Sequence, residues 1–247
     1  MAGGGLAISG LRKAFGPVQV LDGVDLAVAP GQRHGLLGVN GAGKTTLFNL
    51  ITGDLPVDAG RILLDGRDMT RASVQARVRA GLGRTYQMSS LAPSLTVRAN
   101  LVLSLGDGRL PSLWQPWRRD GDAARVLEVA ERFALRELLD QPVNVLSHGG
   151  HRQLELAMAL LQRPRILLLD EPGAGLSPSE RRILARVVRE LPADVGLLMI
   201  EHDMDIILKL CEHITVLHQG RVLVRGTPAE VASNPVVREI YLGQAHA

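Results

Sequence analysis

Short hydrophobic runs separated by turn residues begin the chain. The runs span residues 6–8, 18–21, 24–28 and 35–37, and the turn residues between them are Gly16-Pro17, Asp22-Gly23 and Pro30-Gly31. Apolar runs of this length, bounded by glycine, proline or aspartate, are typical of β-strands. We therefore expect residues 6–37 to be rich in strands, with a turn at each of these pairs.

A helix is predicted directly after this region. It starts near Gly43, places Leu47, Leu50 and Ile51 on one face, and ends before Gly53. Spacings of three and four residues put apolar side chains on one side of a helix, and a glycine just past the last of them is a common stop signal.

Residues 89–163 change to helical periodicity. A loop rich in Gly, Pro and Trp spans residues 106–117. Two groups of apolar residues then recur at helical spacing: Val126, Leu127, Val129, Ala130 and Phe133, followed by Leu154, Ala157, Met158 and Leu161. This segment is predicted to be a helical subdomain.

Strands and helices alternate on both sides of this helical segment. The expected strands are residues 61–65, 166–169, 197–200, 214–217 and 222–224, and the expected helices are residues 178–191 and 204–211. Strands that alternate with helices favour a parallel sheet, and buried parallel strands read as continuous apolar runs. We therefore predict an α/β fold with a parallel sheet, and a hairpin formed by the last two strands.

The composition is that of an ordinary globular protein. Hydrophobic residues make up 46% of the chain and charged residues 21%, which excludes intrinsic disorder. A single cysteine, Cys211, excludes a disulfide-stapled scaffold and is expected to be a small buried hydrophobe. No apolar run approaches the ~18 residues of a membrane span, and residues 1–5 lack a secretory signal. We expect a soluble cytoplasmic protein, or one that a partner holds at a membrane.

The sharpest motif is the glycine-rich segment Gly38-Val39-Asn40-Gly41-Ala42-Gly43-Lys44-Thr45. It fits the phosphate-loop pattern G-x-x-x-x-G-K-[ST], and it lies between an expected strand and an expected helix. Glycines let backbone N–H groups converge on phosphate oxygens, and the helix N-terminus adds partial positive charge. Lys44 can reach the terminal phosphates, and the Thr45 hydroxyl can bind Mg²⁺.

Two more apolar strands end in polar clusters. The strand at residues 166–169 is followed by Asp170-Glu171, and the strand at residues 197–200 by Glu201-His202-Asp203. Ligands of open α/β sheets bind at the carboxyl ends of the strands. Asp170 can therefore hold Mg²⁺ directly or through water, and Glu171 can activate a water molecule as a general base. His202 can reach the terminal phosphate, although a lone histidine after a strand is usually a structural residue.

The order of these motifs resembles that of the ATP-binding subunits of ATP-binding cassette (ABC) transporters, over essentially the whole chain. Gln87, in Arg84-Thr85-Tyr86-Gln87, stands where that family has its glutamine loop. Leu146-Ser147-His148-Gly149-Gly150 resembles the family signature, which usually reads L-S-G-G-Q. His202 stands at the position of the family's switch histidine.

This resemblance implies the architecture. It implies a P-loop NTPase core with a parallel sheet, an antiparallel β-subdomain and an inserted helical subdomain. The chain would then be a single ABC ATPase domain, in which residues 1–87 and 164–247 form the nucleotide-binding core with the β-subdomain. Residues 88–163 would form the helical subdomain.

The resemblance also implies Mg²⁺-dependent ATP hydrolysis and the roles of the site residues. Glu171 would be the general base, His202 would orient the γ-phosphate and Gln87 would sense it. Mg²⁺ would be held by Thr45, Gln87 and Asp170. ATP would be bound by Phe15, Gly38, Val39, Asn40, Gly41, Ala42, Gly43, Lys44, Thr45 and Thr46.

In the family, the signature of one subunit caps the γ-phosphate held by another, within a head-to-tail dimer. The resemblance therefore implies that Ser147, His148, Gly149 and Gly150 contact the nucleotide of a second subunit. From its residues alone, Ser147 is equally an ordinary N-cap ahead of a helix expected at residues 152–161. The second subunit would be another copy of this chain or a related one.

Three positions depart from the usual family pattern. His148 replaces the usual third-position glycine of the signature, and Gly150 replaces the usual glutamine. Ser177 stands where many members have an aspartate, so any contact across the dimer through this position must differ.

Phe15 stands where the family stacks an aromatic ring on adenine, but it can also be interpreted as a core residue. The apolar residues Met88, Leu91, Leu95 and Val97 either line a groove for the membrane subunit or belong to a helix core.

Three segments in the second half of the chain indicate which subgroup of the family the sequence resembles. Glu201-His202-Asp203-Met204, Ala174-Gly175-Leu176-Ser177-Pro178 and residues 226–243 look like the ATPases of branched-chain amino acid importers, with urea and amide importers as relatives. The resemblance implies a peripheral subunit at the cytoplasmic face of the plasma (inner) membrane. It would work with transmembrane permease subunits and, indirectly, with a periplasmic or extracellular solute-binding protein, to import a small polar solute.

Two alternative functions stay open on the sequence. An ATPase of a lipid or lipopolysaccharide exporter shares every ATP-site motif. A nucleic-acid-associated ABC ATPase is suggested by an excess of basic residues, 28 against 25 acidic ones. The basic residues are dispersed rather than gathered in a stripe, so no nucleic acid partner is expected.

Overall fold

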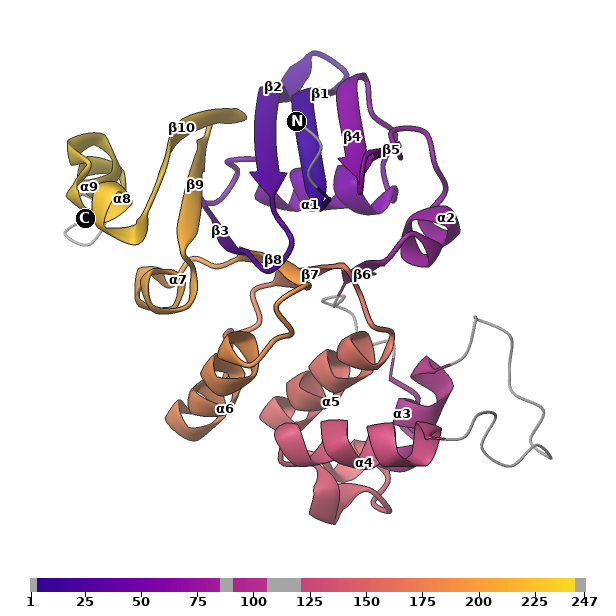
Figure 1. Cartoon of the computed structure of the whole chain (residues 1–247). Helices are drawn as coiled ribbons and strands as arrows, with labels where there is room; N and C mark the ends of the chain where they lie inside the picture. The colour runs from indigo at the N-terminus through magenta and orange to yellow at the C-terminus, as the bar shows by residue number, and fades with distance from the viewer. Residues whose placement is uncertain (1–3, 85–90, 106–120, 243–247) are drawn as a thin grey trace. The chain divides into compact units, whose positions relative to one another are not determined.

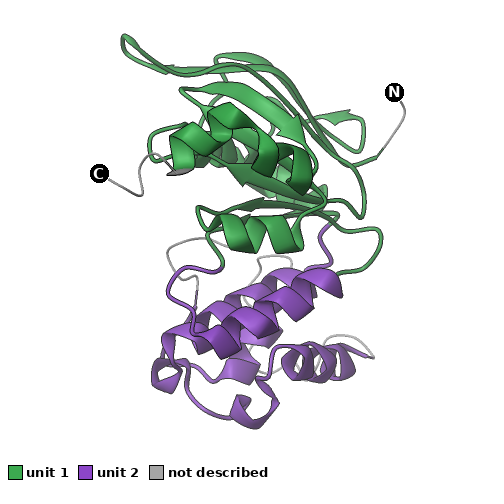
Figure 2. Ribbon diagram, turned by 90° about the vertical axis from the view of Figure 1, so that its left-hand side faces the viewer, with its two compact units in different colours: residues 1–84, 165–172, 191–247 green, residues 85–164, 173–190 purple. Residues whose placement is uncertain are grey.

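The computed structural model of the chain shows a mixed α/β protein (Figure 1). The structure describes residues 4–84, 91–105 and 121–242. The chain divides into two compact units (Figure 2): the first comprises residues 1–84, 165–172 and 191–247, and the second comprises residues 85–164 and 173–190. The second unit thus contains residues 173–190 in addition to the segment expected to be helical. The domain boundaries expected from the sequence stay a prediction.

A six-stranded sheet in the first unit confirms the predicted parallel sheet. Its strands in spatial order are β10 (Arg221–Gly226), β9 (His213–His218), β3 (Arg33–Leu37), β8 (Gly196–Ile200), β7 (Ile166–Asp170) and β6 (Leu82–Arg84). The β9–β10 hairpin is antiparallel, as predicted, and the other neighbours are parallel. Every residue of β3, β7 and β8 is buried. This burial explains the continuous apolar runs at residues 35–37, 166–169 and 197–200.

A four-stranded antiparallel sheet also belongs to the first unit. Its order is β2 (Val18–Val28), β1 (Leu6–Phe15), β4 (Ala59–Leu64) and β5 (Arg67–Asp68). The turn predicted at Asp22-Gly23 is wrong, because both residues lie inside β2. Leu11 pairs with Val24 and Arg12 pairs with Asp22, so Gly23 is the extra residue of a β-bulge. Its φ of +72° suits a glycine, and the glycine therefore bends a strand rather than ending one.

The helix predicted after the phosphate loop is α1 (Lys44–Thr52), and Gly53 ends it with a φ of +85°. Its apolar face, with Leu47 and Phe48, is fully buried. Arg77, from α2 (Val74–Arg79), is also buried and closes the far end of this helix. Its Nη1 donates to the carbonyls of Leu50 at 2.5 Å and of Ile51 at 2.6 Å. These carbonyls lack partners within the helix, so a buried guanidinium satisfies them.

The remaining helices of the first unit are α7 (Met204–Leu210), α8 (Pro228–Ser233) and α9 (Pro235–Leu242). Thr227 starts α8 with a capping box, in which its hydroxyl accepts from Glu230 N and the Glu230 carboxylate accepts from Thr227 N. Cys211 follows α7 and is buried, as expected, and burial raises the pKa of its thiol to about 12.

The described part of the second unit is helical, as predicted. It contains α3 (Val97–Ser104), α4 (Asp122–Arg132), two 3₁₀ turns (Arg136–Leu138 and Val143–Val145), α5 (His148–Leu161) and α6 (Pro178–Arg189). Helix α5 contacts both α3 and α4, and residues such as Leu101, Val126 and Leu154 are fully buried. No helix in the described ranges is long and apolar enough to cross a membrane.

Candidate active site

The phosphate loop joins the buried strand β3 to α1. Gly41 and Gly43 have φ angles of +79° and +104°, which L side chains rarely adopt. A Cβ at Gly43 would also lie 2.7 Å from Leu21 Cδ2, and one at Gly38 would lie 2.7 Å from the Leu217 carbonyl oxygen. The path of the loop therefore requires glycine at these positions for conformation and for space.

The Lys44 side chain is hydrogen-bonded to the backbone of this loop. It is buried, and Nζ donates to the carbonyl oxygens of Gly38 at 2.5 Å and of Val39 at 3.1 Å. Burial lowers the pKa of Lys44, whereas the nearby charges of Glu171 and Asp170 oppose that shift. The ammonium group thus sits among oxygen acceptors, in a position where phosphate oxygens can replace the carbonyls.

The N-terminus of α1 receives no side-chain cap from the described residues. Gly43 is the N-cap and offers no side-chain acceptor to the first amides of the helix. Such amides have no partners within a helix, and together with the helix dipole they favour an anion. Thr45 and Thr46 belong to this first turn. Lys44, Thr45 and Thr46 therefore follow the glycines of the loop directly, and their contact with phosphate stays a prediction.

Asp170 ends β7 as a buried carboxylate. Neither of its oxygens has a hydrogen-bond partner among the described residues, and Arg84 Nη2 lies 3.5 Å from Oδ2. Burial raises the pKa of Asp170, and the charge of Arg84 opposes this rise. A buried carboxylate of this kind fits a divalent cation. The described residues contain no cluster of three His, Cys, Asp or Glu side chains, so such a cation would need the Thr45 hydroxyl and phosphate oxygens as well.

Glu171 and His202 meet directly after neighbouring strands. The Glu171 amide donates to the Ile200 carbonyl at 2.9 Å, which ties the end of β7 to the end of β8. Glu171 has a left-handed backbone, with φ of +49°, and its Oε1 lies 3.2 Å from His202 Nδ1. A non-glycine residue held in this conformation costs energy and is often found at functional sites. The two predicted residues are therefore within hydrogen-bonding distance of one another.

Arg84 is a residue of this site that the sequence analysis missed. Its Nη1 lies 2.9 Å from Asn49 Oδ1 and 2.9 Å from Asp54 Oδ2, at the end of α1. The same guanidinium faces Asp170, so it joins the end of the phosphate-loop helix to the carboxylate at the end of β7. The only sequence signal for it is its place three residues before Gln87.

Phe15 is at the end of β1 with 47% of its surface exposed, so the interpretation as a core residue is wrong. Lys13 Nζ lies 5.5 Å from the centre of its ring and forms an ion pair with Asp58 at 2.7 Å. An exposed ring beside a cation leaves a face open for stacking. Its contact with adenine stays a prediction.

The signature segment lies in the second unit and forms the start of α5. Ser147 is the N-cap, and its hydroxyl accepts from the Gly150 amide at 3.0 Å. The helix begins at His148, so the start predicted at residue 152 is wrong. Two adjacent glycines disfavour a helix by propensity, but the serine cap stabilises its first turn. The interpretation of Ser147 as an N-cap is therefore confirmed. Its contact with the nucleotide of a second subunit stays a prediction.

The signature contacts the segment that leads into α6. Ser177 caps α6 in a capping box with Glu180, whose Oε2 accepts from Ser177 N at 2.8 Å. The other carboxylate oxygen, Oε1, accepts from the Ser147 hydroxyl at 3.3 Å. A Cβ added to Gly175 would lie 3.1 Å from the His148 ring, so this glycine makes room for the unusual histidine.

Gln87 and Met88 lie outside the described residues, so their predicted roles are untested. Among the other residues considered for a groove, Leu91 and Val97 are buried, whereas Leu95 is 40% exposed. The first two are therefore core residues of the second unit. Within the first unit, the structure brings together the phosphate loop, Asp170, Glu171 and His202.

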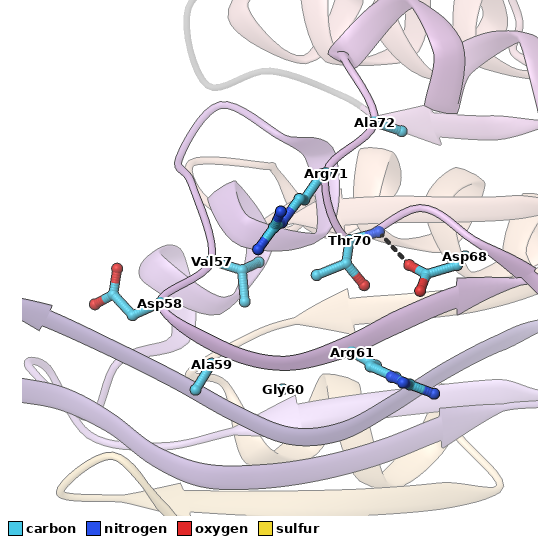
Figure 3. Close-up of a pocket in the computed structure, with 9 residues that line it drawn as sticks. All are labelled: Val57, Asp58, Ala59, Gly60, Arg61, Asp68, Thr70, Arg71 and Ala72. Atoms are coloured by element: carbon cyan, nitrogen blue, oxygen red, sulfur yellow. Dashed lines mark hydrogen bonds between the residues drawn. The ribbon is translucent and has the colours of Figure 1, made fainter.

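A separate cavity of about 520 Å³ lies in the first unit, beside the antiparallel sheet (Figure 3). Arg61 and Arg71 line it together with Asp58 and Asp68, and the Thr70 amide donates to Asp68 at 2.9 Å. None of the predicted nucleotide-binding residues lines it. The charges of these two arginines and two aspartates cancel, so the net charge of the cavity lining favours neither an anionic nor a cationic ligand.

Comparison with known proteins identifies the family of the chain. The ABC transporter family matches residues 21–174, and a branched-chain amino acid ATP-binding cassette transporter family matches residues 221–247. The high-affinity branched-chain amino acid transport ATP-binding protein BraF of Pseudomonas aeruginosa is 36% identical, over 97% of this chain and 98% of BraF. The lipopolysaccharide export system ATP-binding protein LptB of Escherichia coli is 36% identical, over 97% of each chain.

A solved structure shares the whole fold. The ADP conformation of MJ1267, an ATP-binding cassette of an ABC transporter, superposes with a TM-score of 0.85 and 30% identity, over 97% of this chain and 98% of that one. ABC ATP-binding subunits work with transmembrane permeases in transporter complexes. The chain belongs to the ABC transporter family, and it is an ATP-binding and ATP-hydrolysing subunit of an ABC transporter.

Proposed function

We propose that this chain powers the import of a small polar solute, with branched-chain amino acids, amides and urea as the candidate class. The observation that carries this proposal is the match of residues 221–247 to the branched-chain amino acid transporter family, together with the similarity to BraF. The phosphate loop and strand-end carboxylates serve any ABC transporter, so the C-terminal segment carries the distinction.

In this proposal the phosphate loop, the residues that follow β7 and β8, and Gln87 carry out hydrolysis. Residues Gly38 to Thr46 hold the phosphates, and Phe15 stacks on the base. Thr45, Gln87 and Asp170 would hold Mg²⁺, which would supply positive charge near the terminal phosphate. Glu171 takes a proton from the attacking water, and His202, 3.2 Å from Glu171, orients the γ-phosphate.

The site is completed by a second ATPase subunit, either another copy of this chain or a related one. Ser147, His148, Gly149 and Gly150 of one subunit contact the nucleotide held by the other. The pair acts at the cytoplasmic face of the plasma (inner) membrane. Closure of the dimer around two nucleotides drives the transmembrane permease subunits, which receive solute from a periplasmic or extracellular binding protein.

The Glu171→Gln variant tests this mechanism. An amide in place of the carboxylate cannot accept the proton, so turnover should fall at least about 100-fold, while ATP binding persists and an ATP-dependent dimer accumulates. Steady-state ATPase assays and size-exclusion chromatography with light scattering measure both effects. Glu190→Gln, at an exposed glutamate after α6, is the control and should behave as wild type. Unchanged turnover in Glu171→Gln would exclude Glu171 as the base.

A second candidate is a lipid or lipopolysaccharide exporter, which the similarity to LptB favours. The two functions differ in what stimulates the ATPase. In proteoliposomes that contain the purified transporter complex, an importer should hydrolyse ATP faster when a solute-loaded binding protein is added outside. The ATPase rate of an exporter should not change when that protein is added, but should rise when its lipid substrate is present in the membrane.

A further inference from the structure

One carboxylate in the second unit joins the starts of two helices. Glu180 Oε2 accepts from Ser177 N at 2.8 Å, which is the local capping box of α6. Its other oxygen, Oε1, accepts from the Ser147 hydroxyl at 3.3 Å, which lies at the start of α5. The capping box alone would use only one oxygen, so the second contact is an additional feature.

The packing around this carboxylate is close. A Cβ added to Gly149 would lie 1.7 Å from Oε1 and 1.9 Å from the carboxylate carbon. The carboxylate therefore lies directly against the backbone of the signature, where any residue with a side chain would displace it. The glycine of the signature and the position of Glu180 thus depend on one another.

The Ser147 hydroxyl has a single proton to donate. It already accepts a hydrogen bond from the Gly150 amide at 3.0 Å, and it donates its own hydrogen bond to Glu180. A phosphate oxygen is also an acceptor only, so it needs that same proton. Glu180 and the phosphate of a bound nucleotide cannot both receive it.

We propose that Glu180 is a positioning residue of the signature. Before the subunits dimerise, Glu180 accepts the hydrogen bond of the Ser147 hydroxyl, and it thereby competes with the nucleotide of the second subunit for that bond. This inference rests on the proposed role of Ser147 in the dimer. When the subunits close, the hydroxyl rotates from the carboxylate to the phosphate, and Glu180 keeps its bond to Ser177. The competition raises the ATP concentration that the dimer requires.

The chain offers a matched control, because α8 starts with the same kind of capping box. Glu230 Oε2 accepts from Thr227 N at 2.7 Å, and Thr227 Oγ1 accepts from Glu230 N at 3.4 Å. Glu230 lies in the first unit, outside the signature. A change from glutamate to glutamine therefore alters the same local cap at both positions, but only at position 180 does it alter the signature.

The test measures ATP-dependent dimerisation by sedimentation velocity, in the non-hydrolysing Glu171→Gln background. Glu180→Gln and Glu180→Ala should each lower the ATP concentration at half-dimerisation, by about two- to tenfold, which is the effect of one hydrogen bond. Glu230→Gln should leave it unchanged. An equal or higher ATP requirement in both Glu180 variants would overturn the inference.

A second variant separates the hydroxyl from a general effect of charge. In a Ser147→Ala background no proton is available, so adding Glu180→Gln should produce no further gain. A gain that persists without the hydroxyl would also overturn the inference. If the Glu171→Gln parent forms no ATP-dependent dimer at all, the proposed function itself fails, and this outcome is distinct from a dimer that forms but ignores Glu180.

Discussion

Helices α1 and α5 both begin with a glycine-rich segment assigned to phosphate, but their first turns are stabilised differently. Helix α1 has Gly43 as its N-cap, whose φ is +104° and which gives no side-chain cap. Helix α5 has Ser147 as its N-cap, whose hydroxyl accepts from the Gly150 amide and donates to Glu180. The first start has no side-chain acceptor among the described residues, whereas at the second start a serine hydroxyl already accepts from one amide.

The two helices therefore use the partial positive charge of their N-termini in different ways. At α1 the charged group held in the loop is the Lys44 ammonium, which attracts phosphate. At α5 the neighbouring group is a carboxylate, which repels it. The first arrangement suits binding of nucleotide by the subunit itself, and the second suits a contact that is made and released.

The largest effect is expected at Lys44. Lys44→Ala removes the charge held inside the loop, so ATPase activity should fall about 100- to 1,000-fold, with weaker ATP binding in a fluorescent-nucleotide titration. Lys209→Ala is the control, because Lys209 is 71% exposed and lies 4.0 Å from Asp205 on α7. Similar losses of ATPase activity in the two variants would mean that Lys44 has no specific role in the phosphate loop.

A smaller effect is expected on stability, where a glycine of the phosphate loop should differ from a glycine of the signature. Gly43→Ala forces a side chain into a φ of +104° and against Leu21, so it should cost about 1–3 kcal/mol in the free energy of unfolding. Gly149→Ala meets the flexible end of Glu180 at a position without a positive φ, so its cost should stay below about 1 kcal/mol. Urea denaturation followed by circular dichroism compares them. Equal costs would contradict the difference between the two helix starts.

The smallest effect concerns the serine caps. Ser147→Ala and Ser73→Ala both remove an N-cap, since Ser73 accepts from the Ala76 amide at 3.3 Å at the start of α2. Each should lose about 1 kcal/mol of stability. Only Ser147→Ala should also raise the ATP concentration needed for the Glu171→Gln dimer. A matching rise in Ser73→Ala would show that dimerisation follows stability alone.

The sequence predicted those parts of the site that depend on local pattern. The phosphate loop, Asp170 and Glu171 could be found because a buried strand, a turn and a polar residue follow one another directly. The start of α5 was misplaced because two glycines hide a first turn that a serine cap stabilises. Local pattern also could not show that Gly23 bends β2, since the bulge is defined by its partner strand.

The contacts that sequence could not predict join residues far apart in the chain. Arg84 reaches Asp54 and Asp170, and Glu180 reaches Ser147, so each depends on how the chain folds back. The spacing of Ser177 and Glu180 does predict a capping box. It gives no sign that the second carboxylate oxygen meets another helix.

The buried guanidinium of Arg77 has a consequence for the electrostatic potential of the phosphate loop. An α-helix carries partial positive charge at its N-terminus and partial negative charge at its C-terminus, and the two partly cancel at a distance. Arg77 places a full positive charge on the C-terminal carbonyls of α1. The negative pole is thereby neutralised inside the protein, and the helix faces its ligand as a source of positive potential rather than as a balanced dipole.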